Sequence, residues 1–253
     1  MSWSVLAGSS VGAGHDRAAV STQDAHAASE VGPALVVAVA DGAGSASIPA
    51  AGAALAVRLA QQEMCRLVRE RGPAEVETVI RDGARRILRR FQRSANALAR
   101  GARLHPRDFA TTLTVVLACP PWVGVFAVGD GFVVTRRGAD DFGLLLAPPG
   151  GVRRPPGATT LIPARYGAAP ARRQITRIEG LTGVAVGTDG METLMIEFAR
   201  ARPVRPAAEP FAQLFALDDD PGTDPSALTR VLAGRRAGEL SGDDRTLVLA
   251  VPR

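Results

Sequence analysis

Five aspartates carry the strongest chemical signal in this sequence. Four of them stand at the ends of apolar runs that indicate strands, each beside a glycine, and the fifth comes shortly before such a run. They are Asp41, Asp130, Asp189 and Asp243, with Asp24 as the fifth. The ends of strands in one sheet can meet, and converging carboxylates repel one another unless cations neutralise them. Oxygen ligands suit Mg²⁺ or Mn²⁺, while the sequence has no His and Cys cluster of the kind that binds zinc.

An ordinary turn is the alternative at each of these positions. Asp-Gly is a common turn dipeptide, so neither Asp41-Gly42 nor Asp189-Gly190 alone indicates a metal ligand. The same glycines would let a backbone carbonyl or a water molecule approach a cation. The order of the short motifs along the chain must therefore distinguish the two interpretations.

The elements that would position these aspartates come in groups. Helices are predicted over about residues 49–71 and 74–99, the second with apolar residues every three or four positions and arginines on another face. Strands are predicted before and after this pair, which favours an α+β fold over an alternating parallel one. The other predicted features are a tight hairpin at 129–131, helices over 192–200 and 226–235, and a loop over 203–210.

The composition excludes several classes of protein. All 30 basic residues are arginine, and the formal net charge is +5. Abundant Ala, Arg, Pro and Gly without any Lys indicates a codon bias, so the positive charge is only weak support for nucleic-acid binding. No motif with aromatic residues between basic ones, of the kind that stacks bases, is present either. Cys65 and Cys119 are too few for a disulfide framework and are expected as core thiols. No charged leader and no apolar run of about 18 residues is present, so we expect a cytoplasmic protein without a membrane partner.

Six motifs follow one another in a recognisable order. They are Gln23-Asp24, Asp41-Gly42-Ala43-Gly44, Ala110-Thr111-Thr112, Val128-Gly129-Asp130, Thr188-Asp189-Gly190-Met191 and Ser241-Gly242-Asp243-Asp244-Arg245-Thr246. This series resembles the type 2C metal-dependent Ser/Thr protein phosphatases. It is most similar to their compact bacterial branch, whose first acidic motif is Gln-Asp. The resemblance extends over nearly the whole chain, from about residue 15 to 251.

The resemblance implies a fold, a reaction and partners. The fold is α+β, with two packed antiparallel β-sheets flanked by helix pairs, in a single domain over residues 1–253. The reaction is the hydrolysis of phosphoserine and phosphothreonine in proteins by water activated between two Mn²⁺ or Mg²⁺ ions, in signalling. The partners are a phosphoprotein substrate and a cognate Ser/Thr kinase.

The resemblance also implies a role for each ligand. Asp41 would bridge the two metals and the Gly42 carbonyl would bind one of them. The remaining roles are Asp24 at the first metal, Asp189 and Asp243 at the second, and Asp130 at a weaker third. Thr111 and Thr112 are expected to pack beneath the site.

Three residues depart from the family pattern. Ala43 stands where many members carry a histidine that protonates the leaving group, and Ala19 where many carry a phosphate-binding arginine. Thr193 replaces an acidic residue near the third metal. His15 and Arg17, in the same opening loop, are the candidates to replace the missing acid and the missing phosphate clamp. These losses leave open a pseudophosphatase that binds phosphoproteins as a regulatory module, although the retained aspartates favour an active enzyme.

Residues 148–170 are predicted to form a mobile flap or insertion, because they are rich in Pro, Gly, Ala and Arg and show no clean period. Arg153 and Arg154 within this segment, and Arg172 and Arg173 just after it, could bind an acidic phosphopeptide. The alternative is a solvated arginine face produced by the same codon bias.

Overall fold

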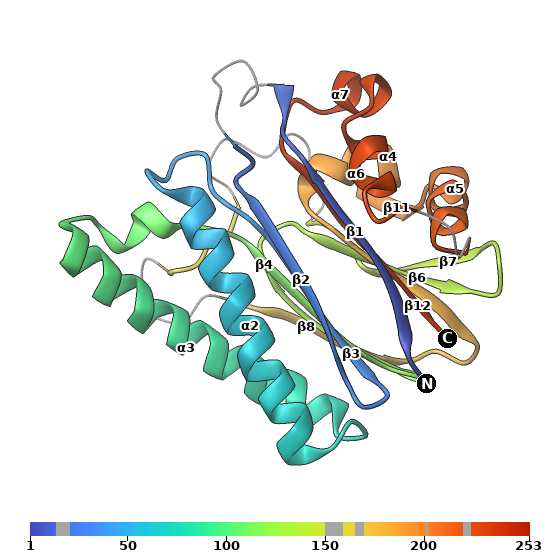
Figure 1. Cartoon of the computed structure of the whole chain (residues 1–253), viewed down its shortest axis with the longest axis horizontal. Helices are drawn as coiled ribbons and strands as arrows, with labels where there is room; N and C mark the ends of the chain where they lie inside the picture. Colours follow the sequence, from blue (N-terminus) through green and yellow to red (C-terminus); the bar gives the residue numbers. More distant parts are fainter. Residues whose placement is uncertain (14–20, 150–158, 165–169, 201, 220–223) are drawn as a thin grey trace.

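The computed structural model describes residues 1–13, 21–149, 159–164, 170–200, 202–219 and 224–253. Two five-stranded antiparallel sheets pack face to face, and helices cover the outer face of each (Figure 1). The first sheet has the order β1 (Trp3–Ser10), β12 (Arg245–Pro252), β9 (Leu181–Gly187), β6 (Phe132–Arg137), β7 (Asp141–Leu146). The second has the order β2 (Asp24–Val31), β3 (Ala34–Asp41), β4 (Leu113–Cys119), β5 (Trp122–Val128), β8 (Arg172–Arg177). The predicted α+β sandwich is confirmed.

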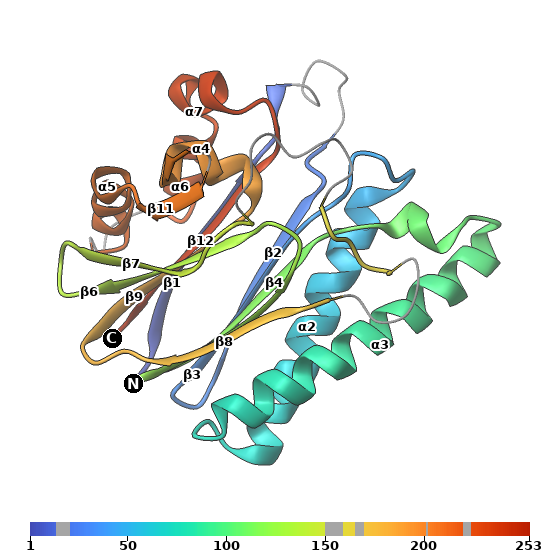
Figure 2. The same ribbon diagram turned by 180° about the vertical axis from the view of Figure 1, so that it is seen from behind.

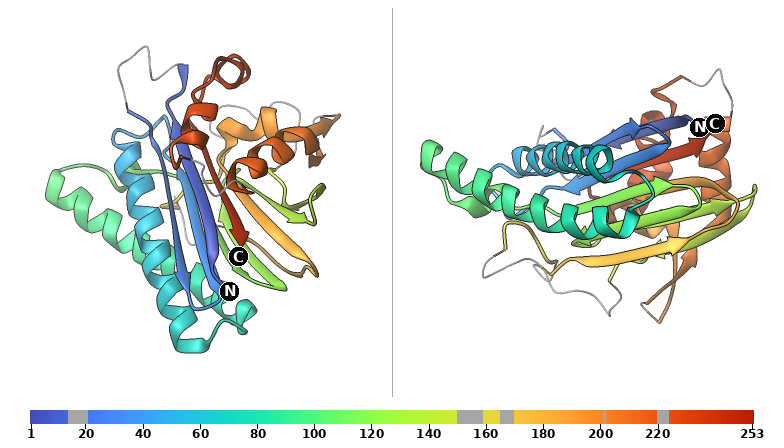
Figure 3. Two further views of the ribbon diagram at one scale, coloured as in Figure 1. Left: turned by 45° about the vertical axis from the view of Figure 1, so that its right-hand side comes forward. Right: turned by 90° about the horizontal axis from the view of Figure 1, so that it is seen from below.

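The continuous apolar run of β3 follows from its place in the middle of the second sheet. Alternate residues point to opposite faces of a strand. Val36 and Ala38 pack under the helices, while Leu35 and Val37 pack between the two sheets. Both faces are therefore dry, and the strand needs apolar residues at every position. Figure 3 shows the resulting layers, with helices outside and strands within.

Two long helices cover the second sheet. They are α2 (Pro49–Arg71) and α3 (Val76–Ala102), close to their predicted bounds, and they form an antiparallel pair (Figure 2). The apolar stripe of α3 includes Ile80, Ile87 and Phe91, all fully buried against the core. A stripe repeating every 3.6 residues leaves the opposite face to solvent, and there the arginines of α3 lie.

Short elements cover the first sheet, and here three sequence predictions are wrong. The predicted helix over 192–200 ends after α4 (Glu192–Met195), and the chain continues as the hairpin of β10 (Ile196–Ala199) and β11 (Arg202–Pro206). The predicted loop over 203–210 contains β11 and the start of α5 (Ala208–Asp219). The predicted helix over 226–235 is divided into α6 (Ala227–Leu232) and α7 (Arg235–Leu240). Packing on the first sheet holds these short pieces in place, through Phe211 and Phe215 among others. Their own sequence periodicity therefore does not predict them.

The predicted hairpin at 129–131 is also wrong. β5 belongs to the second sheet and β6 to the first, so the chain crosses between sheets at this point. Gly129 has φ +105°, and a Cβ there would lie 2.6 Å from Cγ2 of Thr112. Arg172 holds this crossing by donating to the carbonyl oxygens of Gly129 (2.9 Å) and Ala147. Its guanidinium is thus used within the fold rather than offered to a phosphopeptide.

The predicted flap lies partly outside the described residues, at 150–158 and 165–169. Within the described part, residues 159–164 lie against the second sheet. Ile162 is buried and exchanges two hydrogen bonds of 2.9 Å with Thr111. Among the helices that the structure describes, none is long and apolar enough to cross a membrane.

Candidate metal centre

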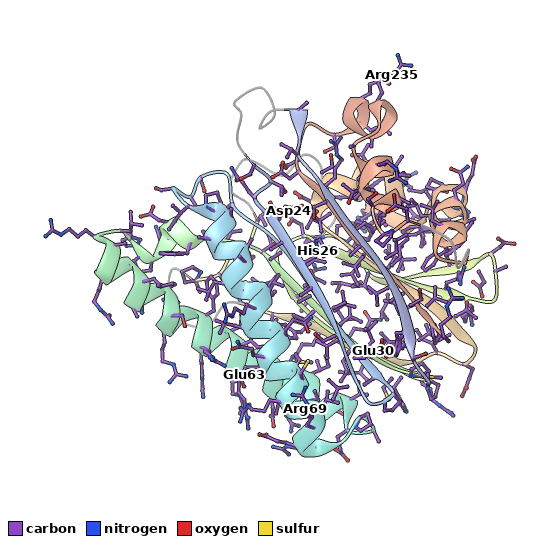
Figure 4. The ribbon with its side chains drawn as sticks, in the orientation of Figure 1. Asp24, His26, Glu30, Glu63, Arg69 and Arg235 are labelled. Carbon is purple, nitrogen blue, oxygen red and sulfur yellow. The ribbon has the colours of Figure 1, made fainter. Side chains whose placement is uncertain are left out.

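Two of the predicted ligands face each other across neighbouring strands. Asp24 is the first residue of β2 and Asp41 the last of β3, and the antiparallel register pairs them directly. Residues opposite one another in such a pair have their Cβ atoms about 4.5–5.5 Å apart. Asp24 is 8% exposed and lies at one end of the sandwich, as its label in Figure 4 shows.

The other three predicted ligands reach the same end of the sandwich from different elements. Asp189 follows β9, Asp243 precedes β12, and Asp130 lies in the crossing between β5 and β6. Their charges act on one another: Asp41 is affected by Asp189, Asp24 and Asp243, and Asp189 is affected by Asp130 as well. The fold therefore brings the five predicted carboxylates into one electrostatic cluster.

Burial makes this cluster costly to ionise. Loss of solvent, followed by repulsion from the other carboxylates, raises the pKa of Asp41 to about 10 and that of Asp189 to about 8. Burial also raises the pKa of Asp24, to about 6, although hydrogen bonds from Thr246 and Thr188 act in the opposite direction. Near pH 7, Asp41 and Asp189 therefore stay neutral or are neutralised by cations.

Two threonines fix the backbone of Asp41. Its N–H donates to Oγ1 of Thr112 (2.9 Å), and its carbonyl oxygen accepts from Oγ1 of Thr111 (2.7 Å) and from the N–H of Thr112 (2.8 Å). Both threonines are buried directly before β4. They hold the end of β3 in place, which is the structural role expected from the sequence.

Gly42 is required by close packing. A Cβ at this position would lie 2.6 Å from the carbonyl carbon of Pro49 and 2.8 Å from the carbonyl oxygen of Gln23. Real Cβ atoms essentially never approach this closely, so the start of α2 would have to move away from Asp41. The glycine thus lets the carboxylate strand and the first helix meet beside the site.

A relay of hydrogen bonds ties Asp24 to the other sheet. The N–H of Thr246, on β12, donates to Oγ1 of Thr188 (3.1 Å), whose hydroxyl donates to Oδ2 of Asp24 (2.9 Å). All three residues are buried. The relay orients the Asp24 carboxylate and joins the two sheets at the end that carries the ligands.

Asp244 anchors both ends of the opening loop. Its Oδ1 accepts from the N–H of Gly12 (2.7 Å) and its Oδ2 from the N–H of Gln23 (2.6 Å). The segment between these two residues carries His15 and Arg17, which lie outside the described residues. This segment therefore starts and finishes beside Asp243, the neighbour of Asp244 in the chain.

The two remaining histidines have structural roles. His26 lies in β2, where its Nδ1 hydrogen-bonds Oγ of Ser9 (3.1 Å) and burial lowers its pKa. His105 caps the 3₁₀ helix η1 (Pro106–Phe109) by accepting from the N–H of Arg107. Neither is among the residues that act on the cluster.

Glu192 joins the acidic surroundings of Asp189, and the sequence analysis missed it. Its charge raises the pKa of Asp189, after burial and three aspartates. Family spacing pointed to Thr193, one residue further on, which is exposed. Asp130, 4% exposed, accepts a hydrogen bond from Thr159 (2.7 Å) through its Oδ2.

The donor set fits divalent cations. Oδ1 of Asp24, Oδ1 of Asp189 and Oε1 of Gln23 are buried oxygens without a hydrogen-bond partner. Such buried acceptors are rare in proteins and call for an explanation, for which an ion is a common one. As they stand, no three His, Cys, Asp or Glu side chains in the described ranges form a group that could hold a metal. The carboxylates must therefore turn toward a cation on binding it, as expected of like charges that otherwise repel.

Two functional residues besides Glu192 escaped the sequence analysis. Asp244 and Thr188 each stood inside a quoted motif, yet neither was given a role. A buried carboxylate beside a ligand can be read from the pair Asp243-Asp244, but its backbone partners depend on where the loop ends lie in space. The sequence gives even less indication of the role of Thr188, since the chain has many hydroxyl side chains and nothing local shows that this one contacts Asp24.

Comparison with known proteins agrees with this arrangement. Residues 11–233 match the family model of protein phosphatase 2C. The chain is 30% identical over 264 residues to Serine/threonine-protein phosphatase 3 of Escherichia coli (strain K12), covering 99% of both proteins. The chain therefore belongs to the protein phosphatase 2C family, whose members are serine/threonine phosphatases, and the enzyme class predicted from the sequence is confirmed.

Solved structures support the same fold. The serine/threonine phosphatase Stp1 from Staphylococcus aureus superposes with a TM-score of 0.68 at 13% identity, over 100% of this chain and 96% of that one. The S. agalactiae serine/threonine phosphatase superposes with a TM-score of 0.66 at 16% identity, over 100% of both chains. At such low identity these likenesses establish the fold alone.

Proposed function

We propose that this protein hydrolyses phosphoserine and phosphothreonine in other proteins, with two Mn²⁺ or Mg²⁺ ions held by the carboxylate cluster. The observation that carries the proposal is the gathering of five carboxylates from both sheets, with buried oxygens of Asp24 and Asp189 lacking partners. Among the described residues, no arginine forms an ion pair with Asp24, Asp41 or Asp189. Cations from solution would balance the charge of these carboxylates when they ionise.

Each ligand would have a distinct place. Asp41, at the centre of the cluster, would bridge the ions, with the Gly42 carbonyl on one of them. Asp24 would complete the first position, Asp189 and Asp243 the second. The ions, when bound, would lower the pKa of a water molecule and neutralise charge on the phosphoryl oxygens.

This chain's own residues hold that arrangement in place. Thr111 and Thr112 hold the backbone of Asp41 in place, and the Thr246–Thr188 relay orients Asp24. Asp130 and Glu192 would support a weaker third ion, since the negative charges of both act on Asp189 and raise its pKa. Thr159 already takes one lone pair of Asp130, which would limit that third site.

His15 and Arg17 are proposed as the general acid and the phosphate clamp. The support is that Asp244 anchors Gly12 and Gln23, so that their loop begins and ends next to the ligands. His15→Ala should slow phosphoserine hydrolysis by ~10²-fold, the usual scale of general acid catalysis, and spare an activated aryl phosphate. Equal effects on both substrates would remove His15 from the mechanism.

The remaining expectations concern setting and partners. A soluble enzyme that reverses a Ser/Thr kinase in the bacterial cytoplasm is the context we propose, with that kinase as its functional counterpart. The alternative, a pseudophosphatase that only binds phosphoproteins, is weakened because every predicted carboxylate ligand is present and gathered at one end of the fold.

The test is metal-dependent turnover. Wild-type protein, Asp41→Asn and the control Asp140→Asn, which alters an exposed aspartate in the turn between β6 and β7, would be assayed on a phosphoseryl peptide and an aryl phosphate. We expect Mn²⁺-dependent hydrolysis of both, lost by at least ~100-fold in Asp41→Asn and kept in the control. Folded wild-type protein that binds the peptide without hydrolysing either substrate would support the pseudophosphatase instead.

A further inference from the structure

A groove of about 850 Å³ lies on the helical side of the molecule, and none of the five aspartates of the acidic cluster lines it. One side is formed by α2 and α3, and the other by residues 162–164. Six arginines line it, one from α2 and five from α3: Arg66, Arg85, Arg86, Arg89, Arg90 and Arg93. A single carboxylate, that of Glu63, is among the lining residues, so the groove is strongly basic.

Glu63 and its neighbour Glu70 balance only part of this charge. Glu63 pairs with Arg66 (2.8 Å) and Arg90 (2.7 Å), and Glu70 lies 3.9 Å from Arg86. Figure 4 shows Glu63 on the helix pair, well away from Asp24. The remaining three arginines therefore determine the character of the groove.

Arg85, Arg89 and Arg93 form a row with no ion pair among the described residues. They are exposed and follow one another at four-residue spacing along α3. From Arg85 to Arg93 is eight residue steps, or about 12 Å of helix. Like charges four residues apart destabilise a helix, so this row opposes folding while it has no counter-charge. An acidic partner of matching length would supply that charge.

The opposite wall of the groove belongs to the segment that contacts the metal centre. At one end of this segment, Thr159 donates to Asp130. Ile162, in the groove wall, exchanges hydrogen bonds with Thr111, which also holds the carbonyl oxygen of Asp41. From Thr159 to Ile162 is three residues, a reach of roughly 10 Å in extended chain. One short segment, residues 159–162, thus connects the groove to the carboxylate cluster.

We propose that this groove binds an acidic stretch of the phosphoprotein substrate, close in sequence to the phosphorylated residue. The inference rests on the proposed function and adds to it a preference for substrates with acidic flanks. Guanidinium groups bind carboxylates in pairs of hydrogen bonds, and a row of them suits successive acidic side chains. Leu88 on α3 and Ala164 on the other wall, both half-buried, add apolar contacts for the aliphatic parts of a peptide, while Ile162 and Pro163 are buried within that wall.

A polypeptide suits the groove better than a nucleic acid does. Single-stranded nucleic acids bind where aromatic rings stack the bases between basic residues. No aromatic side chain is among the described residues that line the groove. The apolar residues that line the groove are aliphatic, which favours peptide side chains over bases.

The test compares two triple variants with equal loss of charge. One is Arg85→Gln, Arg89→Gln, Arg93→Gln, and the other Arg58→Gln, Arg100→Gln, Arg202→Gln, which removes three exposed arginines outside the groove. Glutamine has nearly the helix propensity of arginine, so α3 should stay folded, as circular dichroism would check. The substrates are a phosphoseryl peptide with Glu flanks, the same peptide with Gln flanks, and an aryl phosphate.

We expect the groove variant to raise KM about 10-fold for the Glu-flanked peptide, as three exposed ion pairs would, with kcat unchanged. The Gln-flanked peptide and the aryl phosphate should show no difference between variants. An equal KM in both variants, or an equal rise for all three substrates, would overturn the proposal. So would an RNA oligonucleotide that competes more strongly than the Glu-flanked peptide. Failure of the proposed function would look different, because wild-type protein would then not hydrolyse the aryl phosphate either.

Discussion

The carboxylate cluster and the arginine groove each gather charges of one sign, and they differ in burial. Asp24 is 8% exposed and Asp130 4%, Asp41 and Asp189 are half-buried and Asp243 alone of the five is exposed, whereas Arg85, Arg89 and Arg93 are all exposed. Charges out of water cannot be left unbalanced, so the cluster shifts its pKa values and calls for cations of its own. Charges in water are screened and solvated, so the row on α3 can await a partner. Burial thus separates a centre for chemistry from a surface for recognition.

The largest expected effect comes from removing a buried hydrogen bond that holds a ligand of the carboxylate cluster. Thr112→Val keeps the shape of the side chain but removes the acceptor for the N–H of Asp41. We expect Mn²⁺ affinity to fall 10–100-fold, the usual cost of losing a group that orients a ligand. Thr135→Val, on β6 in the other sheet, is the control and should bind Mn²⁺ normally. Unchanged affinity in Thr112→Val would show that Asp41 needs no such support.

The pH dependence of stability offers a second comparison. In protein freed of metal with a chelator, the folded state keeps protons on Asp24, Asp41 and Asp189 that the unfolded state loses near pH 4. The unfolded state then binds fewer protons, so the free energy of unfolding must fall as pH rises. The fall begins above pH 4, and the contribution of Asp24 is complete near pH 6, that of Asp189 near pH 8 and that of Asp41 near pH 10.

Urea titrations at pH 5 and pH 8 would measure this effect. Wild-type protein should lose several kcal/mol between the two, since Asp41 and Asp189 contribute up to about 1.4 kcal/mol per pH unit across this range and Asp24 does so only up to about pH 6. Asp41→Asn should lose less and be the more stable of the two proteins at pH 8. The groove variant should follow the wild-type curve. Greater stability of metal-free wild-type protein at pH 8 would mean that the cluster is not repulsive.

Salt gives the smallest expected effect. It should act on the arginine row and leave the carboxylate site almost unchanged, whereas pH should act on the carboxylate site alone. The arginine row is exposed, so raising NaCl from 50 to 500 mM should increase KM for the Glu-flanked peptide several-fold. Hydrolysis of the aryl phosphate, which needs only the carboxylate site, should change little. A preference for acidic flanks that persists at 500 mM NaCl would place recognition in buried contacts rather than on α3.

The sequence predicts the two regions unequally. The aspartates were found because their order along the chain resembles a known series, and α2 and α3 because their apolar stripes repeat every 3.6 residues. β2 was missed, since its Ala, His, Ser and Glu residues have little strand preference and only pairing with β3 makes it a strand. β6 was predicted to pair with β5, whereas it pairs with β7 and β9 in the other sheet, because Gly-Asp-Gly suits a crossing between sheets as well as a tight turn.

The groove was beyond sequence reasoning for a similar reason. The four-residue spacing of the arginines on the second helix is visible in the sequence, and codon bias explained it adequately. What gives the row a different meaning is Glu63, which balances Arg66 and Arg90 only, and Ile162, which forms the opposite wall. Both depend on the folded positions of segments far apart along the chain.

Calorimetric titration with Mn²⁺ tests the central claim most directly. Wild-type protein and Asp140→Asn should each bind two ions per chain, and Asp41→Asn should lose tight binding of both, because the carboxylate of Asp41 is proposed to bind both ions at once. Folding of Asp41→Asn would be checked by circular dichroism in the same buffer. Two ions bound by folded Asp41→Asn with wild-type affinity would contradict the assignment of the carboxylate cluster as the metal centre.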